Sequence, residues 1–255
     1  MPEPGVRHIV LVHGAWQGSW SFAAWRPLLQ ARGWQVHAVD LPGNGWPPLA
    51  DAPASLDAYT AHVVAVVRAI GQPVALLGHS GGGQTVAQVA EAVPDQIAVL
   101  VYLAGMMLPS GQTYADFVRQ AAVDDPALAS AGIGAHLDWL DGGRVSQVQP
   151  DGARRLFLHD VEPGAAQAAI DLLRPQPETG RQMRNRLSAE RFGRVPRVYL
   201  GCRDDRSLLW PLQQRMQRLT PGALALDLDC GHVPQLAQPA ALTHLLLPAL
   251  ERFLH

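Results

Sequence analysis

The chain has 255 residues, of which 48% are hydrophobic, and its formal net charge is -2 at pH 7. Such a composition is typical of a globular protein with a sizeable core and excludes a disordered chain. With so little net charge and no long run of like charge, the sequence also argues against nucleic acid or an anionic membrane as a partner. The chain contains no lysine, so neither a Schiff-base lysine nor a phosphate-loop lysine is available.

Short β-rich runs alternate with helical stretches along the chain. Most of the β-rich runs are continuously apolar, as expected when helices cover both faces of a sheet. This alternation predicts an α/β fold with a doubly wound, mostly parallel sheet. In chain order the predicted elements are strand HIVLVHG from His8, helix 25–32, strand QVHAVDL from Gln35, helix 55–70 with Ser55 as N-cap and Gly71 as its end, strand VALLGH from Val74, strand AVLVYLAG from Ala98, strand RVYLGC from Arg197, helix 209–219, strand ALALDL from Ala223 and helix 240–253.

The alternation stops between about Leu108 and Arg194. This segment combines helical stretches with glycine- and proline-rich loops, and no β-rich run is evident in it. We interpret residues 108–194 as a helical cap inserted between two parts of one core, residues 1–107 and 195–255. The insertion and the core are expected to fold as a single unit.

The expected location is the cytoplasm. The first apolar run is short, contains His8 and lacks a cleavage pattern, so it predicts a strand and not a signal peptide. No apolar stretch approaches the length of a membrane span. The two cysteines, Cys202 and Cys230, are too few for a disulfide framework, and we expect buried thiols there. Without a CxxC pair or another ligand motif, neither a metal nor a cofactor is expected.

A nucleophile elbow is predicted at Ser80. The sequence GHSGG over 78–82 follows a buried strand and precedes a helix, which is the context in which a serine stands exposed at a strained turn. The glycines around it allow the strand and the helix to approach closely. His79, beside the serine, is expected to pack into the elbow.

A serine hydroxyl is a weak nucleophile and needs a base. In this type of fold the base is a histidine that follows the serine and an acid in the chain. Of the later histidines, only His232 comes directly after a predicted strand, in the sequence DLDCGHVPQ, so we expect it to be the base. The others lie in the insertion, in the last helix or at the terminus: His136, His159, His244 and His255.

The acid that orients His232 is expected after the strand RVYLGC. Two neighbouring carboxylates, Asp204 and Asp205, follow that strand, and the residues alone do not choose between them. The oxyanion donors are expected to be the backbone N–H groups of Ala15, in the loop HGAW after the first strand, and of Gly81.

Four stretches of the chain resemble the α/β-hydrolase superfamily, and within it the plant methylesterase and hydroxynitrile lyase group with its bacterial esterase relatives. The resemblance implies a six-stranded, mostly parallel sheet with a small helical cap. It favours Asp205 as the acid and supports Ala15 and Gly81 as oxyanion donors. The stretches are VLVHGAWQGSWSFAAWRPLLQARGWQVHAVDLPGNG, VALLGHSGGG, LSAERFGRVPRVYLGCRDD and CGHVPQLAQP.

The expected activity is that of a carboxylesterase-type serine hydrolase, which cleaves a hydrophobic or aromatic ester through an acyl-enzyme. The only partner expected is the small-molecule ester, apart from self-association, and the chain is expected to be a monomer or a homodimer. Substrate-binding candidates are the apolar side chains near the motifs. They are Trp16, Met106, Val233, Trp139 and Trp210, with Met107 as a further candidate.

Other chemistries of the same fold stay open. A hydroxynitrile lyase of the resembled group needs a threonine and a lysine where this chain has Gly14 and Val233, so its cationic helper is missing. The lyase, a carbon–carbon bond hydrolase, a perhydrolase and a ligand receptor that retains the three residues remain alternatives. Turnover of a chromogenic ester separates an esterase from a receptor.

Overall fold

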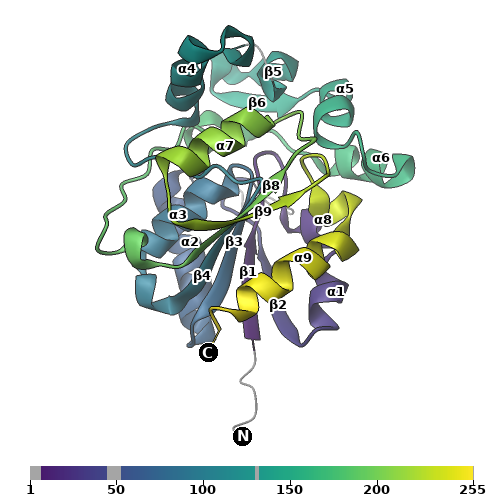
Figure 1. Cartoon of the computed structure of the whole chain (residues 1–255). Coiled ribbons are helices and arrows are strands. Elements are labelled where there is room, and N and C mark those ends of the chain that lie inside the picture. The colour runs from purple at the N-terminus through teal and green to yellow at the C-terminus, as the bar shows by residue number, and fades with distance from the viewer. Residues whose placement is uncertain (1–6, 45–52, 130–131, 255) are drawn as a thin grey trace, which may run out of the picture.

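The computed structural model describes residues 7–44, 53–129 and 132–254. Its centre is a sheet of six parallel strands in the order β2-β1-β3-β4-β8-β9 (Figure 1). The predicted doubly wound, parallel architecture is confirmed, and each predicted strand lies within one or two residues of an observed one. The strands are β1 (Arg7–Val12), β2 (Trp34–Val39), β3 (Val74–His79), β4 (Ile97–Leu103), β8 (Arg197–Cys202) and β9 (Ala223–Leu228).

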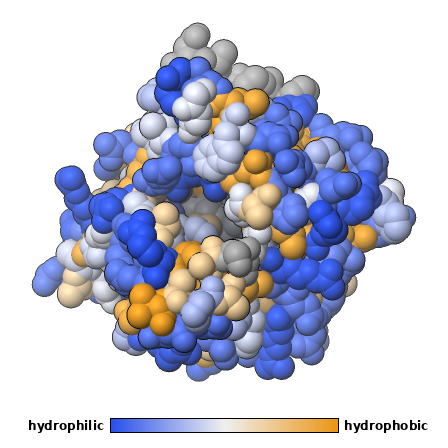
Figure 2. Space-filling model, turned by 90° about the horizontal axis from the view of Figure 1, so that it is seen from above, coloured by the Kyte–Doolittle hydropathy of each residue, from blue (hydrophilic) through white to orange (hydrophobic). Residues whose placement is uncertain are grey.

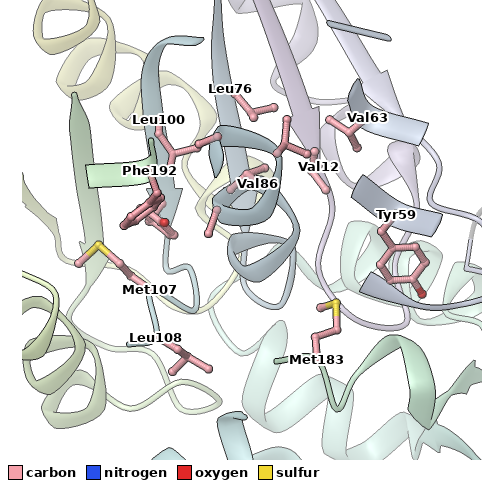
Figure 3. Close-up of a cluster of buried hydrophobic side chains, with 14 of the residues drawn as sticks. Val12, Tyr59, Val63, Leu76, Val86, Leu100, Met107, Leu108, Met183 and Phe192 are labelled. Atoms are coloured by element: carbon pink, nitrogen blue, oxygen red, sulfur yellow. The ribbon is translucent and has the colours of Figure 1, made fainter. Parts of the chain in front are cut away.

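Helices cover both faces of the sheet. One face packs against α2 (Leu56–Ile70), α3 (Gly82–Ala92) and α7 (Trp210–Leu219), and the other against α1 (Arg26–Gln30) and α9 (Pro239–Glu251). The central strands β3 and β8 are therefore buried along their whole length, whereas the edge strand β9 is not. Figure 3 shows the first interface, where Leu76 and Leu100 of the sheet pack with Val86 of α3.

The sequence signals for helix boundaries hold. The Ser55 side chain accepts a hydrogen bond from the N–H of Ala58, and Gly71 ends α2 with a φ of 74°. The short helix α8 (Pro234–Ala237) precedes α9. In the described ranges, no helix is both long enough and apolar enough to cross a bilayer.

The insertion between β4 and β8 is not purely helical. It contains α4 (Tyr114–Asp124), α5 (Pro150–Gly152) and α6 (Pro163–Leu172), and also an antiparallel sheet of β5 (Leu137–Leu140), β6 (Val145–Val148) and β7 (Gln176–Pro177). The expectation of no strand here is wrong, because these strands are short and partly exposed and so lack a continuous apolar run. The division at residues 108 and 194 stays a prediction.

The insertion lies over the edge of the sheet at which the strands end. A third apolar cluster joins it to the core, with Phe157 and Ile170 of the insertion packed against Trp16 and Val233. Seen from this side, the molecule is hollowed near its middle, and hydrophobic residues reach the rim of the hollow (Figure 2). The ends of the strands and the insertion thus enclose the region where a site is expected.

Glu91 of α3 fixes the point at which the insertion returns to the core. Its carboxylate accepts hydrogen bonds from the backbone N–H and the hydroxyl of Ser188 and from the N–H of Phe192. Burial alone would raise the pKa of Glu91, but these hydrogen bonds and the charge of Arg191 outweigh it and lower the pKa below 4.5.

We therefore expect Glu91→Gln to lower the free energy of unfolding by about 1–2 kcal/mol at neutral pH. Since the folded pKa lies below the unfolded value, this contribution is complete above pH 4.5 and is lost as the pH falls through the folded pKa. Urea denaturation of both proteins across this range measures the difference. Asp95→Asn is the matched control, because Asp95 pairs with Arg194 at the surface and is 80% exposed. If the wild-type protein keeps its higher free energy of unfolding at acid pH, the ionised carboxylate of Glu91 is not the source of the difference.

Candidate active site

Ser80 occupies a strained turn between β3 and α3. Its φ is 51°, a left-handed value that costs a residue with a side chain about 1–3 kcal/mol. Three backbone hydrogen bonds hold the turn: the Ser80 N–H donates to Leu103, and the Ser80 carbonyl accepts from Gly83 and Met106. The strain is thus supported by the neighbouring strand end and by the first turn of α3.

The backbone around Ser80 is packed so closely that several positions leave no room for a side chain. A Cβ on Gly78 would lie 2.6 Å from the carbonyl oxygen of Gly82, and one on Gly82 would lie 2.5 Å from that of His13. A Cβ on Gly14 would lie 2.8 Å from the Cβ of Ser80. Because backbone atoms cannot move away as a flexible side chain can, only glycine fits at Gly78 and Gly82.

His232 connects Ser80 to an acid. Its Nε2 lies 3.0 Å from the Ser80 Oγ, and its Nδ1 lies 2.7 Å from the Asp205 Oδ2. An ionised carboxylate can only accept, so Nδ1 carries the proton and Nε2 is free to accept from the serine hydroxyl. With only 1% of His232 and 4% of Asp205 exposed, water competes little for these bonds.

Asp205 and not Asp204 faces the histidine. The N–H groups of Ser207 and Leu208 both donate to the Asp205 Oδ1 at 2.8 Å, and Gln213 donates to Oδ2. Asp204 is exposed, and among the described residues only its backbone N–H is hydrogen-bonded, to the carbonyl of Cys230. The turn after β8 therefore directs one of the two adjacent carboxylates inward and the other outward.

Two further histidines support the site without charge. His79 packs into the elbow, as predicted, and donates from Nε2 to the carbonyl of His232 at 2.8 Å. Burial lowers the pKa of His79 well below its usual value, and the nearby His232 lowers it further. Burial also lowers the pKa of His13, whose Nε2 accepts from the N–H of Leu41. The neutral ring of His79 thus holds the backbone of His232, and that of His13 holds the backbone of Leu41.

Two backbone N–H groups beside Ser80 are free to bind a negative oxygen. Gly81 begins the first turn of α3, and its ideal Cβ position lies 3.7 Å from the nitrogen of Ala15. Neither N–H has an acceptor among the described residues. Preorganised amides of this kind stabilise developing negative charge, so the pair can serve as an oxyanion hole.

A cavity of about 520 Å³ opens above Ser80. The structure brings three of the predicted substrate-binding side chains to its wall: Trp16, Met106 and Trp139. Apolar residues of the insertion make up much of the remaining wall, among them Val118, Ile133, Leu137 and Phe157. The cavity therefore suits a largely apolar ligand.

The predictions for Val233 and Trp210 are wrong, since neither lines this cavity in the described part of the chain. Val233 is fully buried and packs in the cluster that joins the insertion to the core. Trp210 stacks with Arg203 on the outer side of β8. Cys202 and Cys230 are free and buried, as expected, and burial raises the pKa of the Cys202 thiol.

A polar section of the cavity wall was missed. It consists of Arg181, Glu178 and Gln176 of the insertion with Tyr59 of α2. Burial raises the pKa of Tyr59 to about 12, so its hydroxyl stays neutral. These residues lie in segments without a recognisable motif, so the sequence carried no signal for them. Within the described ranges, no three His, Cys, Asp or Glu side chains are grouped to hold a metal ion.

The comparisons with known proteins agree with the fold. A model of the alpha/beta hydrolase family matches residues 9–245. A pyrethroid hydrolase of Sphingobium wenxiniae is 31% identical over 93% of this chain and 85% of its own, and methylesterase 1 of Arabidopsis thaliana is 27% identical over 98% of both. A crystal structure of a pyrethroid hydrolase superposes with a TM-score of 0.81 at 27% identity, over 98% of this chain and 99% of that one.

The hydrogen-bond chain from Asp205 to Ser80 predicts an unusually reactive serine. A fluorophosphonate should label Ser80 stoichiometrically, because His232 accepts the hydroxyl proton as the phosphorus is attacked. Peptide mass spectrometry locates the adduct, and Ser80→Ala should remain unlabelled with its circular dichroism unchanged. Labelling of another serine in the wild-type protein would refute the assignment.

The same reagent separates the two aspartates. We expect Asp205→Asn to slow labelling by roughly 10²-fold or more, because an asparagine amide stabilises the wrong histidine tautomer. Asp204→Asn, the adjacent control, should label at nearly the wild-type rate. Slow labelling of Asp204→Asn with normal labelling of Asp205→Asn would show that the acid is assigned to the wrong residue.

Proposed function

This chain belongs to the alpha/beta hydrolase family, and from that premise we propose that it hydrolyses a hydrophobic or aromatic carboxylic ester through an acyl-enzyme at Ser80. Its esterase relatives support ester hydrolysis as the activity. The observation that supports an acyl-enzyme and an apolar ester is the hydrogen-bonded series Asp205, His232 and Ser80 at the floor of a largely apolar cavity.

In the first half of the reaction, Ser80 Oγ attacks the ester carbonyl while His232 Nε2 takes the hydroxyl proton. The N–H groups of Ala15 and Gly81 receive the oxyanion, and one such donor is worth roughly 3 kcal/mol. Asp205 stabilises the imidazolium without becoming protonated. His232 then protonates the departing alcohol oxygen, which leaves the acyl group on Ser80.

The second half repeats these roles with water. His232 takes a proton from the water that attacks the acyl carbonyl, and the same two N–H groups bind the oxyanion again. Collapse of this intermediate returns the proton from His232 to Ser80 Oγ and releases the carboxylic acid. Bonds and protons balance with ester and water as the only reactants, so this route requires no cofactor.

The walls of the cavity favour an ester with apolar substituents. The rings of Tyr114, which is half-buried, and Phe157 line the cavity, so an alkyl or aryl group can pack against them. Expulsion of cyanide would need a cation to meet the leaving anion. Val233, at the position of the lyase lysine, is buried and does not line the cavity. Among the described lining residues there are two arginines, Arg181 and Arg119, and they are paired with Glu178 and Asp116.

We expect measurable hydrolysis of p-nitrophenyl acetate or butyrate and of a methyl ester of an aromatic acid. Ser80→Ala should lower kcat/KM by several orders of magnitude with the fold intact. Mandelonitrile should release no cyanide above background. Absorbance assays and a cyanide electrode measure the two reactions. Cyanide release with negligible esterase activity would overturn the proposal, and binding of the esters without turnover would favour a receptor.

A further inference from the structure

Arg181 is an unusual component of the cavity wall. Its guanidinium lies over the ring of Trp16, 4.2 Å from the ring centroid, and its side chain is 21% exposed. Burial lowers the pKa of Arg181 and the charge of Glu178 counteracts this, so the side chain stays cationic. A stacked and paired guanidinium is held in one orientation before any ligand arrives.

Only one nitrogen of this guanidinium is paired. Nη1 donates to the hydroxyl of Ser146 at 3.0 Å and to the carboxylate of Glu178. Nε and Nη2 have no partner among the described residues, although a guanidinium carries five N–H donors. Nε and Nη2 are not among the buried polar atoms that lack a partner, so this free edge is open to the cavity that Arg181 lines and can donate hydrogen bonds to a ligand there.

The partners of Arg181 account for Nη1 but not for the rest of the guanidinium. Ser146 also donates to Glu178 at 2.6 Å and accepts from the indole N–H of Trp16 at 3.1 Å. Gln182 also donates to Glu178, and Nη1 is the guanidinium nitrogen that takes part in this network among the described residues, so Nε and Nη2 are not needed for it. Because Glu178 balances the charge of Arg181, the free edge favours an uncharged acceptor over an anion.

Arg181 lines the same cavity as Ser80 and is linked to the oxyanion loop through Trp16. Trp16 directly follows the oxyanion donor Ala15, and the Trp16 N–H donates to Gln176 at 3.0 Å. Gln176 in turn donates to the hydroxyl of Tyr59. The polar wall is therefore built onto the oxyanion loop, whereas Ile133 and Leu137 belong to the apolar wall supplied by the insertion. An ester bound at Ser80 would meet two chemically different surfaces.

We propose that Arg181 is a specificity-determining residue that donates hydrogen bonds to an uncharged acceptor on the substrate, such as a ketone, an ether or a second ester carbonyl. The inference rests on the proposed function, because it concerns the substrate of the same site. It narrows that substrate to an ester with one apolar part and one part that carries an acceptor.

The test uses matched pairs of methyl esters. Each pair consists of a keto ester and a twin in which a methylidene group replaces the ketone oxygen, and the ketone is moved along the acyl chain from pair to pair. For the best-placed ketone, we expect the wild-type enzyme to prefer the keto ester by about tenfold in kcat/KM, the size of a hydrogen bond to a charged group. A ratio near one for every pair would overturn the proposal.

The variant Arg181→Met with Glu178→Gln removes the guanidinium without leaving a carboxylate unpaired. For this double variant, the ratio of kcat/KM between the keto ester and its twin should fall to near one. Arg184→Met should keep the wild-type ratio, because Arg184 pairs with Asp116 outside the cavity. If the double variant does not fold, Arg181→Lys replaces it, since lysine keeps the charge beside Glu178 but lacks the planar fork. A ratio that persists without the guanidinium would refute the role of Arg181.

Binding to Ser80→Ala by calorimetry separates this proposal from the proposed function. A preference of this variant for the keto ester, lost with the Arg181 changes, supports the inference even if the wild-type protein hydrolyses no ester. Hydrolysis of both twins at equal rates would support the proposed function and overturn the inference.

Discussion

The turn at Ser80 is the constraint on which the rest of the site depends. A residue with a side chain is held at a φ of 51°, between a strand buried along its whole length and a helix whose first residues touch the end of β1. That conformation persists because the end of β4, the loop directly after β4 and the start of α3 all hydrogen-bond to it. As a result, the hydroxyl points away from the sheet and toward the loops that follow the other strands.

The parallel sheet then brings the remaining groups together. Because all six strands run in one direction, the loops after β1, β8 and β9 emerge at the edge where Ser80 lies. Cys202 of β8 pairs in register with Leu228 of β9, so the two loops that carry Asp205 and His232 start side by side. Burying Asp205 and His232 is costly, and the hydrogen bonds that Asp205 accepts from two backbone N–H groups compensate for the loss of water. The insertion closes the site from above and supplies most of its apolar surface.

Much of this arrangement could be predicted from the sequence. Continuous apolar runs located the six strands, and a glycine-flanked serine and a histidine after a strand located Ser80 and His232. Adjacent carboxylates could not be distinguished by pattern, because a one-residue difference in the turn decides which of Asp204 and Asp205 points inward.

The insertion was harder to predict. The strands β5, β6 and β7 are too short and too polar to give a periodic signal. Proximity to a motif was also misleading. Val233 and Trp210 adjoin the predicted site in sequence, but Val233 packs in the cluster between the insertion and the core, and the ring of Trp210 lies against Gly201 of β8. Arg181 was missed because two of its contacts, Trp16 and Ser146, reach it from distant segments of the chain. The central claim, a covalent intermediate on Ser80, is tested most directly by intact-protein and peptide mass spectrometry of enzyme acid-quenched during turnover of p-nitrophenyl butyrate. The account predicts a butyryl group on the peptide that contains Ser80, absent from Ser80→Ala; turnover with no adduct, or with an adduct on another residue, would contradict it.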